Sequence, residues 1–322
     1  MPTPSPCSTG RTTREPDRGR PRGEMTRRPD LFIVGAPKCG TTAMTRYLEA
    51  HPDVFVASRK DLHWFGSDLG FRNRAREAEA DYLACFAAAG GARWACDSSV
   101  WYLYSTRAAA EIRAYSPDAR IIALIRHPVS AMHALWSQLR LNGLGDEDIA
   151  DFAAALAAEP DRAAGRRIPA HTPLPEALQY RRVVAFSDQL QRYLDAFPRD
   201  RVRVVVQEEM KADTAGTVGD TYAWLGVDPA FRPDLGKVNT SKAVRSEGLR
   251  KVLRATPAGL KDAIPAGLRR QLSRRLRKLN SRHAARAALD PALRARLEAE
   301  MAPEVARIEA VLGRAIPAWR PR

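Results

Sequence analysis

Short runs of β-forming apolar residues recur through the first two thirds of the chain. They lie at Leu31–Val34, Asp53–Ala57, Arg120–Ile125 and Val202–Val206. Runs this short and this rich in Val, Ile, Leu and Phe are typical of strands buried on both faces of a parallel sheet. The sequence therefore predicts one strand at each of these positions.

Stretches with helical periodicity separate the predicted strands. Thr41–Ala50 has apolar side chains at helical spacing and stops at His51-Pro52, because the residue before a proline disfavours a helix. A second helix follows the Arg120–Ile125 run and extends through Leu141. Further helices are expected at about 146–158, 176–196 and 214–225. Buried strands that alternate with helices predict an α/β fold with a mostly parallel sheet flanked by helices.

The two ends of the chain depart from this pattern. Residues 1–30 are rich in Pro, Arg, Ser and Thr, so we expect a flexible basic tail there. The domain that contains the predicted sheet spans 31–246. Beyond Ser246 we expect no more strands, and 247–322 is interpreted as a basic helical C-terminal subdomain. Its short amphipathic helices are expected to break at Pro257, Pro265, Pro291, Pro303 and Pro317.

The net charge of +15 sits almost entirely at these two ends. Residues 1–30 hold seven Arg and four acidic residues, and 245–322 hold nineteen Lys or Arg and seven acidic residues. The middle of the chain is therefore neutral, whereas a nucleic-acid-binding domain is basic throughout one face. We expect no nucleic-acid partner. The basic stretch Leu249–Arg286 is either a solvated helical face or a peripheral contact with an anionic surface.

Cysteine spacing and hydropathy exclude several classes of protein. Cys7, Cys39, Cys85 and Cys96 form no CxxC pair and have no His at zinc-ligand spacing, so we expect buried thiols and no metal. No window approaches the roughly 20 apolar residues of a membrane-spanning helix. The N-terminus lacks the apolar core of a signal peptide, so a cytoplasmic location is expected.

A glycine-containing turn, Gly35–Thr42, joins the first predicted strand to the first helix. Backbone N–H groups and the positive end of a helix make such a turn a phosphate-binding site. A nucleotide triphosphatase would place lysine directly after Gly40, but this chain has Thr41 there and its lysine, Lys38, inside the turn. The Val202–Val206 run also lacks the terminal Asp that would hold a magnesium ion. ATP or GTP hydrolysis is therefore disfavoured.

The turn is similar to the binding loop of the PAPS-dependent sulfotransferase superfamily, where PAPS is 3′-phosphoadenosine-5′-phosphosulfate. The residues that carry the resemblance are Pro37, Lys38, Cys39, Gly40, Thr41 and Thr42. It implies a P-loop-like, doubly wound sheet, and it implies that these residues bind the 5′-phosphosulfate of the donor. Lys38 would contact the bridging oxygen of the leaving phosphate, and Gly40, Thr41 and Thr42 would donate hydrogen bonds to the phosphate.

Arg126-His127-Pro128-Val129 resembles a second motif of the same superfamily. There an arginine at the end of a strand binds the 3′-phosphate of the donor, a role that suits a guanidinium. The superfamily places a serine eight residues later, where this chain has Ala134. Ser130 or Ser137 is the candidate substitute. In the late basic loop 237–246, Lys242 and Arg245 are the candidates that would neutralise the 3′-phosphate.

Lys60-Asp61-Leu62-His63-Trp64-Phe65 resembles the Lys-Glu-x-His-Phe-Phe segment of carbohydrate sulfotransferases. The glutamate of that segment is the implied general base, so Asp61 is the expected base here, with His63 as its orienter or as an alternative base. Lys38 is the third expected catalytic residue, because its charge offsets the charge that develops on the leaving phosphate.

The remaining resemblances are to the acceptor side and to the tail of the superfamily. Asp97–Tyr104 resembles a Glu-x-Ser-Pro-x-Tyr segment that lines the acceptor side, and Trp101 or Tyr102 is either a stacking platform or part of an aromatic core. Leu289-Asp290-Pro291 and Trp319 resemble the tail of bacterial members. The chain thus looks like a bacterial member similar to the heparan-sulfate-type carbohydrate sulfotransferases.

The sequence predicts an enzyme that transfers a sulfonate group from PAPS to a hydroxyl, or less often an amine, of an acceptor. The acceptor is expected to be a glycan, a lipid or a small natural product. Two alternatives stay open. One is a P-loop kinase of a small molecule, and the other is a non-enzymatic protein that binds anions, nucleic acid or membranes through its basic C-terminal region.

Overall fold

The computed structural model describes residues 27–72, 77–141, 146–236 and 288–320, and the backbone of 242–244 and 281–283. Most of the expected tail 1–30 and of the basic stretch Leu249–Arg286 lies outside these residues. Arg245 also lies outside them, and so does the side chain of Lys242. The predictions for these two residues and for the two regions keep the status of predictions.

A five-stranded parallel sheet forms the centre of the molecule, with strand order β2-β3-β1-β4-β5. The first strand, β1, lies in the middle of the sheet and β2 lies at one edge. β3 fills the position between them, and β4 and β5 then extend the sheet to the other edge. Such a sheet is doubly wound, and ligands bind at the carboxyl ends of its strands near the central strand. The strands are β1 Leu31–Gly35, β2 Val54–Val56, β3 Trp94–Ser98, β4 Arg120–Ile125 and β5 Val202–Val206.

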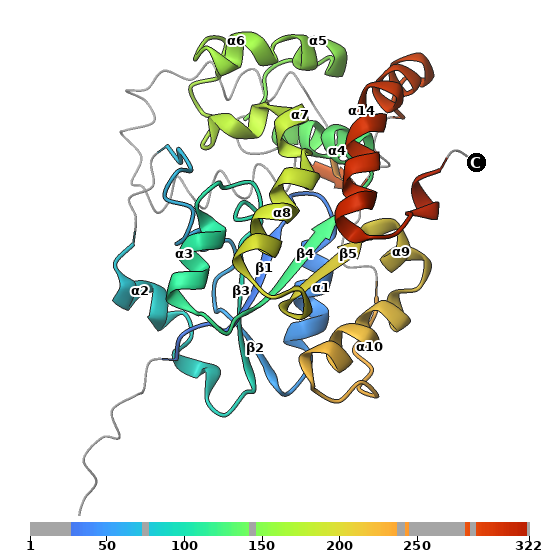
Figure 1. Ribbon diagram of the computed structural model, residues 1–322. Coiled ribbons are helices and arrows are strands. Elements are labelled where there is room, and N and C mark those ends of the chain that lie inside the picture. The colour runs from blue at the N-terminus through green and yellow to red at the C-terminus, as the bar shows by residue number, and fades with distance from the viewer. Residues whose placement is uncertain are drawn as a thin grey trace, which may run out of the picture.

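Helices flank the sheet, with α3 and α8 in front of it in the view of Figure 1. This arrangement confirms the expected α/β fold. The α-helices are α1 Thr41–Glu49, α2 Glu79–Ala84, α3 Ala108–Tyr115, α4 Pro128–Leu141, α5 Phe152–Ala157, α6 Glu159–Ala163, α7 Tyr180–Val183, α8 Phe186–Ala196, α9 Gln207–Ala212, α10 Thr214–Leu225 and α14 Pro291–Leu312. Four short 3-10 helices are Ala87–Ala89 (η1), Pro175–Leu178 (η2), Arg199–Arg201 (η3) and Pro317–Trp319 (η4).

The core follows the apolar runs of the sequence. Every residue of β1 is buried, and β4 is buried from Ile121 onward, because helices cover both faces of these central strands. α8 turns Phe186, Leu190 and Tyr193 to the core, a spacing that keeps them on one face of a helix. Burial of this apolar surface stabilises the sheet that positions the site.

Several predicted elements differ from the structure in extent. β3 was not predicted as a strand from the pattern, because its second half is the polar pair Asp97 and Ser98. The helix expected at 146–158 begins only at Phe152, where Asp151 accepts a hydrogen bond from the N–H of Ala154 and so caps the helix. The segment 176–196 is divided into η2, α7 and α8.

The C-terminal region corrects two expectations. Strand β7, Ser281–His283, pairs antiparallel with β6, Lys242–Val244, so the expectation of no strand beyond Ser246 was wrong. α14 begins at Pro291 and continues through Pro303 instead of breaking there. Proline suits the first position of a helix. At Pro303 the lost backbone hydrogen bond is outweighed by packing of α14 against α8 and α4, as Figure 1 shows.

Candidate functional site

The turn after β1 is shaped by backbone geometry that few sequences allow. The N–H of Ala36 donates to the carbonyl of Leu124 at 2.7 Å, which directs the chain over the end of β4. A side chain at Gly35 would approach Leu103 Cβ to 2.7 Å and the carbonyl oxygen of Val100 to 2.8 Å. The turn therefore fits against the β3–α3 connection only because position 35 has no Cβ.

Two residues of the turn adopt the left-handed conformation. Lys38 has φ 65°, which is strained for a residue with a Cβ, and Gly40 has φ 97°. Gly40 also precedes α1 without a side-chain cap, and the first turn of α1 contains no acidic residue. The positive end of α1 is thus available to an anion.

Lys38 and a buried glutamine add polar groups beside the turn. Lys38 Nζ donates to Gln138 Oε1 on α4 at 3.0 Å. Gln207, at the end of β5, is only 8% exposed, and its Oε1 has no hydrogen-bond partner within the described residues. Its Nε2 lies 3.4 Å from the position that a Cβ on Gly40 would occupy. Gln207 Oε1 is an acceptor only, so it can pair with a hydroxyl or an N–H group and not with a phosphate oxygen.

Cys39 lies within the turn but its side chain belongs to the core. It is fully buried, and burial raises the pKa of its thiol well above the usual range. Any contact from this position to a donor would therefore come from the backbone. Cys39, Cys85 and Cys96 are all buried free thiols, as expected from their spacing.

Arg126 stands at the end of β4 and contacts a carboxylate on α9. Its side chain is 18% exposed, and its Nε lies 3.8 Å from Glu208 Oε1. The same carboxylate accepts hydrogen bonds from the backbone N–H of His127 at 3.3 Å and from Trp319 Nε1 at 2.9 Å. Glu208 therefore links the end of β4 to η4, near the C-terminus.

The helix that follows Arg126 has no hydroxyl at the position where the resemblance places one. Ala134 is fully buried, whereas Ser130 and Ser137 are partly exposed on the same helix, α4. Either serine is a more accessible hydroxyl than position 134 could supply. Their role in binding a 3′-phosphate stays a prediction.

The Lys60–Phe65 segment is held in an unusual backbone conformation. Asp61 and His63 both lie in the left-handed region, with φ 58° and 45°. The N–H of Asp61 donates to the carbonyl of Ser98 at 3.0 Å, and the N–H of His63 donates to Ser99 Oγ at 3.0 Å. Strained backbone that is fixed by several contacts is a frequent feature of functional sites.

A buried carboxylate, Asp97, holds this segment through a network of hydrogen bonds. Its Oδ1 accepts from Ser99 Oγ at 2.7 Å, and its Oδ2 accepts from the hydroxyls of Tyr82 and Tyr102, each at 2.9 Å. The Tyr102 hydroxyl in turn accepts from the backbone N–H of Trp64 at 2.8 Å. Asp97 and Tyr102 are fully buried, so they hold the segment in place and do not line an acceptor surface.

Burial controls the ionisation of Asp97. It raises the pKa of this carboxyl to about 6, although the three hydroxyl donors act in the opposite direction. The Asp97 carboxyl therefore stays protonated to a higher pH than an exposed aspartate does. The sequence had marked this residue only as part of a possible acceptor segment, because its central position depends on contacts between distant parts of the chain.

Direct contacts join the Lys60–Phe65 segment to the turn after β1. Lys60 Nζ donates to Thr42 Oγ1 at 2.8 Å. A second connection runs through Ser98, whose carbonyl accepts from the N–H of Asp61 and whose Oγ lies 2.8 Å from Thr45 Oγ1 on α1. The structure thus brings the predicted donor turn and the predicted base segment together at the carboxyl ends of the central strands.

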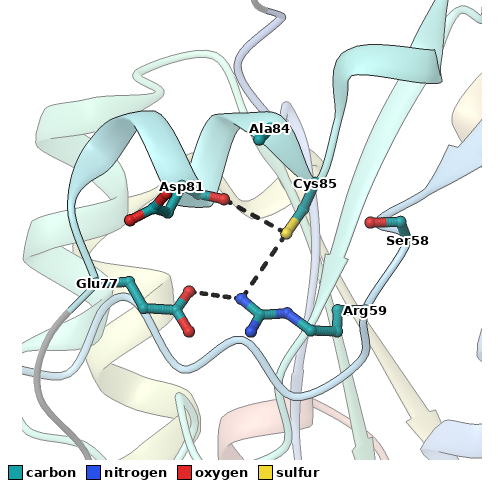
Figure 2. Close-up of a pocket in the computed structure, with 6 residues that line it drawn as sticks. All are labelled: Ser58, Arg59, Glu77, Asp81, Ala84 and Cys85. Atoms are coloured by element: carbon teal, nitrogen blue, oxygen red, sulfur yellow. Dashed lines mark hydrogen bonds and ion pairs between the residues drawn. The ribbon is translucent and has the colours of Figure 1, made fainter.

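A separate pocket lies beside this site. Figure 2 shows Arg59 reaching across the pocket to Glu77, with 2.5 Å between Nη2 and Oε2, and Cys85 near the same guanidinium. Arg59 directly precedes Lys60, but none of Lys38, Asp61 and His63 lines the pocket. Its lining residues are Ser58, Arg59, Glu77, Asp81, Ala84 and Cys85.

Metal-binding clusters and membrane-spanning helices are both absent among the described residues. Across the ranges between 27 and 320 that the structure describes, no group of three or more His, Cys, Asp or Glu side chains could hold a metal ion. Within the same ranges, no helix combines the length and the apolar content that crossing a bilayer requires.

A doubly wound parallel sheet with an anion-binding turn between its central strand and the next helix defines a P-loop-like class of protein. The sulfotransferase domain family matches residues 28–239, and the chain belongs to this family. The predicted superfamily is thereby confirmed.

Similarity to individual proteins agrees with this assignment. Human heparan sulfate glucosamine 3-O-sulfotransferase 6 is 26% identical over 203 residues, which cover 62% of this chain and 52% of that protein. Human carbohydrate sulfotransferase 15 is 27% identical over 150 residues, which cover 33% of this chain and 26% of that protein. The chain thus spans about half, or less, of the length of these relatives.

A solved bacterial structure extends the similarity to most of the chain. The crystal structure of a sulfotransferase from Alicyclobacillus acidocaldarius is 28% identical and superimposes with a TM-score of 0.68. The alignment covers 92% of this chain and 100% of that chain. The match supports both the fold and the predicted likeness to a bacterial member of the family.

Proposed function

We propose that the protein transfers a sulfonate group from PAPS to a hydroxyl group of a glycan. The observation that carries the proposal is the turn Pro37–Thr42, which places Lys38 and the uncapped N-terminus of α1 at the carboxyl end of β1. Family membership supports sulfonate transfer over the small-molecule kinase and over a non-enzymatic role.

The donor would lie along the turn with its 5′-phosphosulfate at the N-terminus of α1. Gly40, Thr41 and Thr42 are proposed to donate hydrogen bonds to the phosphate, with Pro37 and Cys39 completing the turn. At the other end of the nucleotide, the 3′-phosphate is proposed to bind Arg126. Lys242, Arg245 and either Ser130 or Ser137 are the further candidates for the 3′-phosphate.

The chemical step is an in-line displacement at sulfur. The acceptor oxygen forms a bond to sulfur while the bond between sulfur and the bridging phosphate oxygen breaks, which releases 3′-phosphoadenosine-5′-phosphate (PAP). Asp61 removes the acceptor proton, and His63 orients the acceptor or replaces Asp61 as the base. Lys38 donates to the bridging oxygen and offsets its negative charge as the bond breaks.

A glycan is the favoured acceptor among the three classes that the sequence leaves open. The similar human proteins are named for heparan sulfate and for carbohydrate as their substrates. Those names describe the relatives, and for this chain they support a sugar hydroxyl over a lipid, a natural product or an amine.

Activity on a panel of acceptors tests this proposal. The full chain is incubated with ³⁵S-labelled PAPS and desulfated heparan oligosaccharides, simple sugars, phenols and lipid head groups. We expect label and a mass gain of one sulfonate on the oligosaccharides. Binding of ATP that depends on magnesium, with no binding of PAP, would instead support a kinase.

A further inference from the structure

Lys60 is the residue of the site whose position the proposed reaction does not explain. Its ammonium group extends from the segment after β2 to α1 and donates to Thr42 Oγ1 at 2.8 Å. Thr42 is the second residue of α1, at the end of the helix that faces the proposed donor. Lys60 therefore connects the base segment to the anion-binding end of α1.

The chemistry of this contact fixes the direction of a second hydrogen bond. An ammonium group has only donors, so the Thr42 hydroxyl must be the acceptor. The hydroxyl hydrogen of Thr42 then points away from Lys60 and is available to another acceptor. A hydroxyl that accepts from a cation is polarised and becomes a better donor itself.

The surroundings of Lys60 favour an anion as that acceptor. Lys60 is half-buried, and within the described ranges its ammonium forms no ion pair with a carboxylate. Burial lowers the pKa of Lys60, and the neighbouring Asp61 acts in the opposite direction. Burial of the ammonium is only partly offset by the Thr42 hydroxyl and by Asp61, and a bound anion nearby would offset it further.

We propose that Lys60 is a positioning residue for the 5′-phosphosulfate end of the donor, acting through the hydroxyl of Thr42. The contact orients that hydroxyl toward the phosphate. It also holds Asp61, the next residue in the chain, close to the group that is transferred. This inference deepens the proposed function and rests on it.

A purely structural link between the two segments would behave differently. It would lower thermal stability and weaken every nucleotide equally, because the whole site would loosen. A positioning role at the 5′ end instead affects only ligands that have a 5′-phosphate. Comparison of PAP with adenosine 3′-monophosphate, which lacks that phosphate, separates the two roles.

Calorimetric titration of both nucleotides into the wild type and four variants tests the proposal. Lys60→Met should weaken PAP about tenfold, in line with the loss of a charge-assisted hydrogen bond, and should change adenosine 3′-monophosphate less than about twofold. In a protein that already has Thr42→Val, Lys60→Met should lower the affinity for PAP by less than about threefold. The hydroxyl through which Lys60 acts is then absent. Lys60→Arg keeps the charge and should retain most of the affinity.

Arg46→Met is the matched control. Arg46 is an exposed cation one turn further along α1, so its loss removes the same charge without touching Thr42. We expect an effect on PAP of less than about twofold, since exposed charges are screened by salt. An equal loss from Arg46→Met, an equal weakening of both nucleotides by Lys60→Met, or additive effects of the Lys60 and Thr42 variants would overturn the inference.

The outcome for the wild type separates this inference from the proposed function. If wild type binds neither nucleotide, the proposed donor is wrong and the inference falls with it. If wild type binds PAP and the Lys60→Met variant binds it equally well, the donor assignment stands and the role of Lys60 is wrong. Thermal melting of each variant confirms that it is folded.

Discussion

Lys38 shows how much of the site depends on the geometry of single residues. The sequence indicated its chemical role, but its left-handed backbone and its contact with Gln138 are visible only in the structure. The contact spans α4 and the turn, so no local pattern could have revealed Gln138. Gln207 was missed for the same reason, since it follows β5 and meets Gly40 only in the folded chain.

Replacement of Lys38 by alanine tests its proposed catalytic charge. We expect sulfonate transfer by the Lys38→Ala variant to fall by a factor of at least about 10²–10³, the usual cost of removing one group that stabilises developing charge. The side chain is not part of the core, so the melting temperature should stay close to that of the wild type. Near-normal turnover in a folded variant would falsify the role of Lys38.

The pair Asp61 and His63 can be separated by two substitutions. Asp61→Asn keeps the size of the side chain but removes the base, so turnover should fall by about 10²–10⁴. His63→Ala should lower turnover less and should raise KM, because it removes an orienting group. Steady-state kinetics with the best acceptor measures both. If only the histidine variant loses turnover, the two roles are reversed.

At the scale of elements, the predictable part of the fold is the part with a periodic sequence. β1, β4 and β5 are continuous apolar runs, and their positions follow from burial on both faces. The pattern does not predict β3, because Asp97 and Ser98 are buried polar residues. Asp97 accepts from Tyr82 on α2, and Ser98 contacts Thr45 on α1 and the N–H of Asp61. Hydrogen bonds to distant parts of the chain therefore stabilise β3, and the strand propensity of its own residues does not predict it.

The buried Asp97 should make the stability of the protein depend on pH. Its folded pKa of about 6 lies above the usual Asp value of 3.8. The contribution to stability is thus fully present below pH 3.8 and is lost as pH rises through 6. The shift of about two units corresponds to roughly 3 kcal/mol of unfolding free energy in total, from pH values well below 3.8 to values well above 6.

Substitution of this carboxyl isolates its contribution. Asp97→Asn cannot ionise, so the unfolding free energy of the variant, measured with urea, should fall by about 2 kcal/mol less than that of the wild type between pH 4 and 7. Comparison of the two slopes cancels the other titrating groups. Parallel curves for the two proteins would show that Asp97 does not titrate in this range.

At the scale of the whole molecule, the C-terminal elements take part in the architecture around the proposed donor site. α14 packs against α8 and α4, and Arg314 forms a two-pronged ion pair with Glu209 at 2.7 Å. Beyond them Trp319 donates to Glu208, which lies beside Arg126. The sequence suggested that Trp319 resembles the tail of bacterial members but did not indicate this connection.

The Trp319 contact predicts an effect on nucleotide binding from a residue remote in sequence. Trp319→Phe keeps an aromatic ring but removes the indole N–H. Glu208 Oε2 is then free to pair with Arg126, and the carboxylate would compete with a 3′-phosphate for the guanidinium. We expect PAP affinity to fall about threefold to tenfold, and adenosine 3′-monophosphate to weaken equally. Adenosine 5′-monophosphate, which lacks the 3′-phosphate, is the control and should bind unchanged.

The link from Trp319 through Glu208 to Arg126 also has a consequence for biosynthesis. A ribosome releases the β4 and α9 residues long before Trp319, so the nascent chain can fold its sheet while Glu208 is still without the indole contact. The indole contact beside Arg126 can form only after Trp319 has been translated. We therefore expect the turn proposed to bind phosphate to fold before the surroundings of Arg126 are complete.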